Sequence, residues 1–214
     1  MSLLDLSEDE IIRRLAIARE IYLPPETGLE NFLKSGIFSE PPRPAAVLVP
    51  FTRIDQSWHI LFTRRNNNLP EHSGQVAFPG GRADPKDATP EDTALRETYE
   101  EIGLNPGSVR ILGSINSFLT ITNYNVKPIV GSVPWPFSIR LAQVEVSRVF
   151  TIPLEWLADP LNHEIQQRSM PAPHSPIPVI YFKPYNGEVL WGVSAYITIN
   201  LLEILVGTSI SKPG

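Results

Sequence analysis

Three glutamates close together in the chain are the residues best suited to chemistry. Glu97, Glu100 and Glu101 are three and four residues apart, which places their side chains on one face of a helix. Like charges at these spacings cost about 0.2–0.5 kcal/mol per pair. A divalent cation such as Mg²⁺ removes that repulsion, because it takes oxygen ligands and bridges carboxylates to phosphates. The alternative is a solvated acidic helix face that holds no ligand.

A pair of glycines precedes these acids. Phe78-Pro79-Gly80-Gly81 ends an extended segment a short distance before the glutamates. Glycine lets the backbone approach a ligand or metal closely, because it has no Cβ atom. The pair is therefore expected to lie beside the acids, the alternative being an ordinary turn.

The helix that carries the glutamates has clear ends. Thr89 followed by Pro90 is typical of a helix start, and Gly103 is typical of a C-terminal cap. Between them an apolar stripe is expected opposite the acids, so that one side packs and the other presents carboxylates. The residues of this stripe are Leu95, Tyr99 and Ile102.

Together these positions resemble the Nudix box, in which a glycine is followed by Glu and then by Arg-Glu-x-x-Glu-Glu-x-Gly. The matching residues are Gly81, Arg96-Glu97, Glu100-Glu101, Gly103 and Leu104. Asp87 stands six residues after Gly81, where the usual box has Glu, and Arg96 comes nine residues later, one more than usual. The role of Asp87 stays open. The coenzyme A branch of the family has the same longer loop.

The residues upstream of the box are similar to the signature of that branch, the coenzyme A pyrophosphatases. They are Leu61 to Arg65, Gly74 and Phe78 to Gly81. Asn66 stands where that signature has a small residue, and Pro70 where it has a basic one. The segment 190–195 near the C-terminus also looks like this branch, with Ser194 in place of the more usual Thr.

The resemblance implies an α+β fold, the Nudix α/β/α sandwich with a mixed β-sheet. It implies that Mg²⁺ or Mn²⁺ is held by Glu97, Glu100, Glu101 and the carbonyl of Gly80. Arg96 corresponds to the box arginine that orients the acids through a salt bridge, and is assigned with Glu100 and Glu101 to the catalytic residues. The substrate-binding candidates are Arg65 and Gly81.

The activity implied by the resemblance is hydrolysis of a pyrophosphate bond. The leading substrate is coenzyme A or acyl-CoA, cleaved to 3′,5′-ADP and (acyl-)4′-phosphopantetheine. The alternatives are a broader hydrolase acting on ADP-ribose or dinucleoside polyphosphates, and a Nudix module that binds a nucleotide without catalysis. The general base is Glu101, Glu100 or Glu145, the last at the start of a later strand.

Hydrophobic periodicity and turn residues predict the elements that must position this site. A helix should follow a capping box at Ser7 and end before Pro24-Pro25, and another should begin near Leu154. We expect a helical extension over 1–40 and the Nudix domain over 41–214. The first helix packs on its own domain or mediates a homodimer. Strands are expected at 45–53, 58–64, 74–78, 109–114, 126–133, 144–152 and 178–182, with a last helix at 192–206. A hairpin turn at Asp55-Gln56-Ser57 should join the first two strands. His72, just before the strand at 74–78, could donate to a phosphate or form a structural hydrogen bond in a turn.

Composition narrows the possible partners and compartments. The net charge of −5 argues against nucleic acid or an anionic membrane as a partner, because both require clustered basic residues. The chain has no cysteine, which excludes disulfides and thiolate chemistry. It opens on acidic residues rather than a signal peptide and has no transmembrane segment, so a cytoplasmic protein acting on a small nucleotide-derived molecule is expected.

Overall fold

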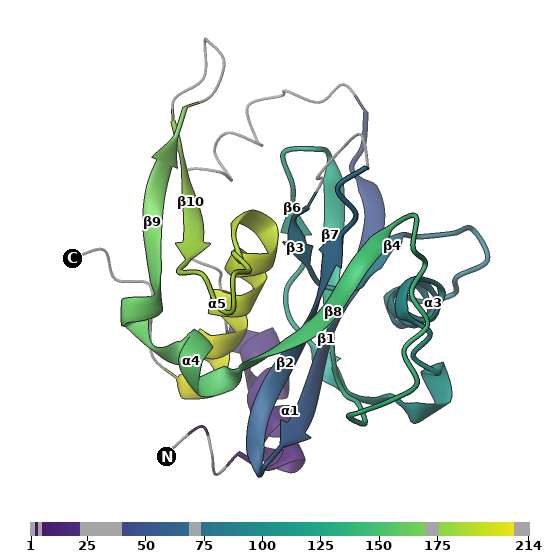
Figure 1. Ribbon diagram of the computed structural model, residues 1–214, viewed down its shortest axis with the longest axis horizontal. Helices are drawn as coiled ribbons and strands as arrows, with labels where there is room; N and C mark the ends of the chain where they lie inside the picture. Colours follow the sequence, from purple (N-terminus) through teal and green to yellow (C-terminus); the bar gives the residue numbers. More distant parts are fainter. Residues whose placement is uncertain (1–2, 4–5, 22–39, 69–73, 170–175, 208–214) are drawn as a thin grey trace.

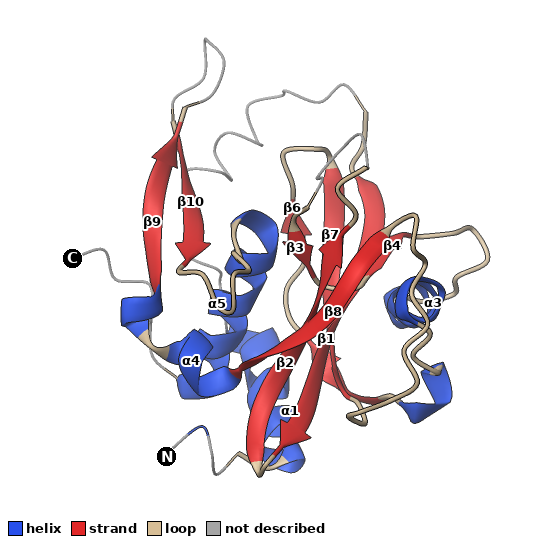
Figure 2. Cartoon of the chain, in the orientation of Figure 1, coloured by secondary structure: helices blue, strands red, loops and turns tan. Residues whose placement is uncertain are grey.

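The computed structural model describes residues 3, 6–21, 40–68, 74–169 and 176–207. Figures 1 and 2 show a β-sheet between two helical layers. Helix α3 (Pro90–Ile102) covers one face, and α1 (Glu8–Ile21) and α5 (Gly192–Val206) lie on the other side. The expected α+β class and α/β/α sandwich are confirmed.

The main sheet is mixed and centred on β1. This strand pairs antiparallel with β2 and β4 and parallel with β7. The strand order is β3-β2-β1-β7-β5. Of the remaining strands, β4 pairs with β1, β6 pairs with β7, and β8 pairs with β2. The strands are β1 (Arg43–Ile54), β2 (Ser57–Arg65), β3 (Val76–Ala77), β4 (Gly80–Arg82), β5 (Arg110–Ser114), β6 (Phe118–Leu119), β7 (Tyr124–Ser132) and β8 (Val146–Pro153).

The predicted turn between the first two strands is confirmed and is two residues long. Asp55 and Gln56 have φ values of 47° and 67°. Two consecutive positive φ angles suit the right-handed twist of a hairpin. Ser57, expected in the turn, begins β2 instead.

Strand alternation places apolar side chains on both faces of the sheet, so the core has two parts. The larger part faces α1 and α5 and includes Phe51 and Phe62. The smaller part faces α3 and includes Leu48, Leu61 and Ile102. Because the two parts of the core cover both faces of β1, they fix the position of this strand relative to α3.

A second, two-stranded sheet lies beside α5. It pairs β9 (His163–Arg168) antiparallel with β10 (Ile177–Phe182) and follows the short α4 (Leu154–Ala158) and a 3₁₀ turn at Pro160–Asn162. Strand β9 is absent from the prediction because most of its residues are polar and exposed, so that no apolar alternation marks it. A further 3₁₀ turn occupies Pro106–Ser108.

Helix α1 is built into the molecule through its apolar face. Leu6, Ile11 and Leu15 are buried in the same core cluster as the main sheet. Ser7 Oγ accepts a hydrogen bond from Glu10 N–H, but the Glu10 carboxylate binds Arg13 and Arg14 instead of completing the capping box. The predicted stop before Pro24-Pro25 lies outside the described residues, and the domain boundary at residue 40 stays a prediction. None of the helices in the described ranges is both long and apolar enough to span a bilayer.

Candidate active site

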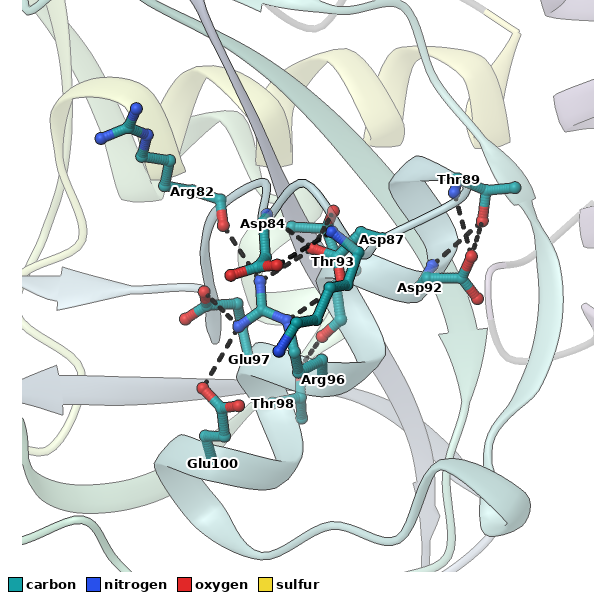
Figure 3. Close-up of polar contacts among 12 residues, drawn as sticks. Arg82, Asp84, Asp87, Thr89, Asp92, Thr93, Arg96, Glu97, Thr98 and Glu100 are labelled. Atoms are coloured by element: carbon teal, nitrogen blue, oxygen red, sulfur yellow. Dashed lines mark hydrogen bonds and ion pairs between the residues drawn. The ribbon is translucent and has the colours of Figure 1, made fainter.

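The ends of α3 are those predicted from its caps. Thr89 Oγ1 accepts a hydrogen bond from Asp92 N–H at 3.1 Å, and the Asp92 carboxylate accepts one from Thr89 N–H at 2.9 Å (Figure 3). Pro90 follows at the first helical position, and Gly103 ends the helix with φ 76°. These contacts satisfy backbone groups that the helix itself leaves free, and they fix which residues face the sheet.

The buried face of α3 differs from the predicted stripe. Tyr99 is 42% exposed, with the Arg140 guanidinium over its ring, whereas Glu101 is only 4% exposed. The expectation that all three acids face away from the packed side was therefore wrong. Small side chains let α3 approach β1 and β4 closely, and that approach buries Glu101. The buried residues are Thr93, Ala94, Thr98, Glu101 and Ile102.

Gly80 and Gly81 fill the narrow space between β1 and α3. Gly80 has φ 147°, and a Cβ there would lie 2.4 Å from the Ala46 carbonyl oxygen. A Cβ on Gly81 would lie 2.5 Å from Glu97 Oε2. The predicted close approach of the glycine backbone to the acids is therefore present. The use of the Gly80 carbonyl as a metal ligand remains a proposal.

Glu101 is a buried carboxylate with one direct donor among the residues that the structure describes. Gly80 N–H donates to its Oε2 at 3.2 Å. Burial raises the pKa of Glu101 to about 8, against the opposing effects of that hydrogen bond and of the positive charge of Arg65. The nearby charges of Glu97 and Glu145 raise the pKa further. Glu101 is therefore mainly protonated near neutral pH unless a cation compensates its charge.

Arg96 is the centre of an ion-pair network on the exposed side of α3 (Figure 3). Its guanidinium donates to both carboxylate oxygens of Asp87, at 3.0 and 2.8 Å. It also donates to Glu97 at 2.8 Å and to Glu100 at 3.2 Å. Arg96 therefore holds two of the three predicted metal-binding acids.

Asp87 fixes the position of Arg96. Its side chain is 7% exposed and also accepts hydrogen bonds from Thr93 Oγ1 and from the Asp84 backbone N–H, each at 2.9 Å. The hydrogen bond from Arg96 holds the pKa of Asp87 well below its usual range. Asp87 stands where the usual box has the longer side chain of Glu, and the loop before α3 is one residue longer than usual. Asp87 thus forms a bidentate pair with the box arginine, Arg96.

Burial also raises the pKa of Glu97, although the ion pair with Arg96 opposes this. The charges of Glu100 and Glu145 raise it further. Glu145 therefore acts electrostatically on both of the less exposed box acids, Glu97 and Glu101. It is an acid from a distant segment, after β7, that the structure brings to the predicted site.

Backbone contacts hold Glu145 at this place. In the segment between β7 and β8, Ala142 N–H donates to the carbonyl of Glu101 at 2.9 Å. Asn66 N–H donates to the Glu145 carbonyl at 2.8 Å, and Asn66 Nδ2 donates to the Gln143 carbonyl at 2.6 Å. Asn66, a departure from the branch signature, therefore ties the end of β2 to the segment that carries Glu145.

An open pocket of about 370 Å³ borders this network. Arg96 and Glu97 form one wall, and the loop after β4 forms the other. Figure 3 shows the side chain of Arg82 directed away from the ion pairs. Of the three box acids, Glu97 thus borders space that a ligand can enter. The lining residues are Arg82, Ala83, Asp84, Pro85, Arg96 and Glu97.

The donor set of the site suits a hard divalent cation. Glu97, Glu100 and Glu101 offer only oxygen ligands, and burial leaves two of them with raised pKa values, which a cation would lower. As the side chains lie, Arg96 occupies oxygens of Glu97 and Glu100, and no three acidic or histidine side chains in the described ranges converge on one point. Metal binding therefore requires these two side chains to turn toward Glu101.

The structure brings most of the predicted site residues together. Gly80, Gly81, Arg96 and the three glutamates are joined by direct contacts, whereas the charge of Arg65 reaches Glu101 from the end of β2. His72, a possible phosphate donor or a structural turn residue, lies outside the described residues, as does Pro70. Sequence reasoning did not identify the roles of Asp87 and Asn66. The position of Asp87 within the box was a signal for its role. The role of Asn66 depends on its contacts with the segment between β7 and β8, which is distant in the sequence.

Comparison with known proteins identifies the family of the chain. Residues 41–175 match the NUDIX domain family. The chain is 36% identical over 170 residues to a protein of Yersinia pestis named as the Nudix hydrolase NudL, covering 79% of this chain and 83% of that protein. Solved structures of similar fold include an Ap4A hydrolase of C. elegans (21% identity, 53% of this chain and 81% of that chain, TM-score 0.44). Another is RenU, a Nudix hydrolase of M. smegmatis (18% identity, 56% and 76%, TM-score 0.47). The chain belongs to the Nudix hydrolase family.

Proposed function

We propose that this enzyme hydrolyses the diphosphate of coenzyme A or acyl-CoA, giving 3′,5′-ADP and (acyl-)4′-phosphopantetheine. The reaction class rests on one observation, the contact of Gly80 and Gly81 with Glu97 and Glu101 beside an open pocket. The choice of coenzyme A rests on the upstream residues that resemble the coenzyme A branch. Arg65 belongs to this set, and its charge acts on Glu101.

In this proposal Glu97, Glu100 and Glu101 hold Mg²⁺ or Mn²⁺, with the carbonyl of Gly80 as a further ligand. When bound, the cation neutralises the diphosphate and polarises its phosphorus atoms. Arg96, held by Asp87, binds Glu97, which lines the pocket, and Glu100. Arg65 and the backbone at Gly81 position the substrate phosphates.

The chemical step adds one water molecule across the diphosphate. A water oxygen attacks one phosphorus, the bond from that phosphorus to the bridging oxygen breaks, and a general base accepts the proton of the water. The base must lie within hydrogen-bond reach of that water. Glu145 is favoured here, because its side chain is exposed and makes no contact with Arg96, unlike Glu100. Glu101 and Glu100 remain the other candidates.

A substrate screen tests the proposal. Turnover of coenzyme A, 3′-dephospho-coenzyme A and ADP-ribose is measured with Mg²⁺ and with Mn²⁺, and the products are identified by mass. We expect coenzyme A to give the highest kcat/KM and products cleaved at the diphosphate. Chelation of the metal should abolish turnover.

Two other results would overturn parts of the proposal. Higher kcat/KM for ADP-ribose or a dinucleoside polyphosphate would favour the broader hydrolase, the alternative suggested by Asn66 and Pro70. Binding of these molecules without turnover under any metal condition would indicate a non-catalytic module. Retention of all three box acids argues against that last possibility.

A further inference from the structure

Two arginines lie opposite each other on the face of the sheet that is turned away from α3. Arg64 in β2 and Arg148 in β8 are paired residues of the antiparallel ladder. Arg64 shares its face with Phe62, which packs in the core on the side of α1 and α5. Like charges directly opposite each other destabilise a sheet, so this pair requires a compensating anion.

Glu188 supplies only part of that compensation. Its side chain is 5% exposed and accepts from Arg64 Nη1 at 3.3 and 3.2 Å and from Arg148 Nη1 at 3.1 Å. These distances exceed the roughly 2.7–2.9 Å of a strong charge-assisted hydrogen bond. Each arginine directs a single nitrogen to the carboxylate. Two guanidinium groups and one carboxylate together carry a formal charge of +1. In the described part of the chain, Glu188 is the only acid that forms an ion pair with either arginine.

Both arginine side chains remain partly accessible to solvent, although the Arg148 guanidinium also lies over the Phe150 ring. The Arg64 and Arg148 side chains are 36% and 51% exposed. A guanidinium offers several N–H groups in a fixed plane and binds phosphate oxygens through two of them at once. Two such groups beside each other on adjacent strands match the oxygens of one terminal phosphate.

This arginine pair adjoins the candidate active site along β2. The next residue, Arg65, acts on Glu101 on the other side of the sheet. The β2–β8 register shifts between Arg64 and Arg65, at the end of the strand. A substrate bound beside Arg65 would have to extend past this end of β2 to contact the arginine pair.

We propose that Arg64 and Arg148 bind a phosphomonoester group of the substrate, separate from the diphosphate that is cleaved. This inference rests on the proposed function, and for coenzyme A the group is the 3′-phosphate. It also accounts for Pro70, which stands where the coenzyme A branch has a basic residue, because the arginine pair supplies positive charge from β2 and β8.

Binding of two nucleotides tests this subsite without catalysis. Affinities for adenosine 3′,5′-bisphosphate and AMP are measured by calorimetry for the unaltered protein, R64Q, R148Q and R64Q/R148Q. We expect the unaltered protein to prefer the bisphosphate by about tenfold or more, since hydrogen bonds to charged groups contribute on this scale. The double variant should lose most of this preference, and R148Q should lose part of it while the Arg64–Glu188 pair remains.

Arg110→Gln is the matched control. Arg110 lies on β5, its side chain is 59% exposed, and it pairs with Glu8. Its replacement removes the same charge and should leave the nucleotide preference unchanged. Equal preference in R64Q/R148Q and the unaltered protein, or the same loss in R110Q, would overturn the subsite.

Kinetics separates failure of the subsite from failure of the proposed function. The ratio of kcat/KM for coenzyme A to that for 3′-dephospho-coenzyme A should fall about tenfold in R64Q/R148Q and by less in R148Q, while turnover of the dephosphorylated substrate changes little. Loss of both activities in equal measure would indicate a structural role for the arginines and contradict the inference. No hydrolysis of either substrate by the unaltered protein, with the bisphosphate preference intact, would refute the coenzyme A assignment alone.

Discussion

Replacement of Glu101 is expected to lower activity without lowering stability. With a pKa of about 8 it is mainly neutral at pH 7, and glutamine is close in shape to the protonated acid. We predict that Glu101→Gln lowers kcat at least about 100-fold, as expected for loss of a metal ligand or a base, while the melting temperature of the metal-free protein is kept or raised. Measurements of turnover test the expected fall in kcat, and thermal unfolding tests the expected melting temperature. Normal turnover by the variant would show that the site is assigned wrongly.

Asp87 acts on the reaction only through Arg96. Asp87→Asn removes one charge from the bidentate pair, so Arg96 is held less firmly against Glu97 and Glu100. A residue that supports metal ligands typically contributes about 10- to 100-fold to metal affinity or activity, and we predict a loss in that range. Titration with Mn²⁺ at fixed substrate concentration measures it. Glu164→Gln is the control, because Glu164 is exposed on β9 in the second sheet and its carboxylate contacts Gln166. An equal loss in both variants would contradict the assignment.

At the scale of elements, the two glycines of β4 should respond differently to alanine. At Gly80 the new Cβ meets the backbone of β1, which cannot move aside, and φ is 147°. We predict that Gly80→Ala lowers the free energy of unfolding by at least about 2 kcal/mol. At Gly81 the Cβ meets only the end of the Glu97 side chain, which can turn away. Gly81→Ala should therefore change stability by less than about 1 kcal/mol but reduce turnover strongly. Urea unfolding and activity of the two variants give the comparison, and similar stabilities would refute it.

The features predicted correctly from sequence are set by local chemistry. Thr89, Pro90 and Gly103 define α3 because caps act within a few residues, and the glycine pair implies a close approach whatever surrounds it. The burial of Glu101 was missed because it depends on how closely α3 packs on distant strands. The apolar spacing of Tyr99 suggested a buried face, whereas small side chains decided which face packs.

On the scale of the whole molecule, Glu101 should make stability depend on pH and on metal. Its pKa is about 8 in the folded protein against 4.5 for an ordinary glutamate, so the folded state holds the proton more tightly. The stabilisation is complete below about pH 4.5 and is lost as the pH rises through about 8. We predict that the metal-free protein loses melting temperature over this window and that Glu101→Gln flattens the loss.

A cation binds the ionised carboxylate, so metal should counteract this loss. The rise in melting temperature produced by Mn²⁺ should be larger at about pH 8 than at about pH 6, because at the lower pH the metal must displace a proton. Thermal unfolding with Mn²⁺ and with chelator measures this difference. A Mn²⁺ effect that is independent of pH, or equal in Glu101→Gln, would contradict it.

The parallel pairing of β1 with β7 has a consequence for how the protein is made. The residues that pair, from Arg43 with Tyr124 to Phe51 with Ser132, are separated by the whole of β4 and α3. During synthesis, a nascent chain that ends before Tyr124 already contains the paired glycines and all three box acids. It lacks the partner strand that covers one edge of β1. Closing so long a loop is slow relative to local contacts. The acidic helix is therefore synthesised before β7, the strand that completes the pairing of β1.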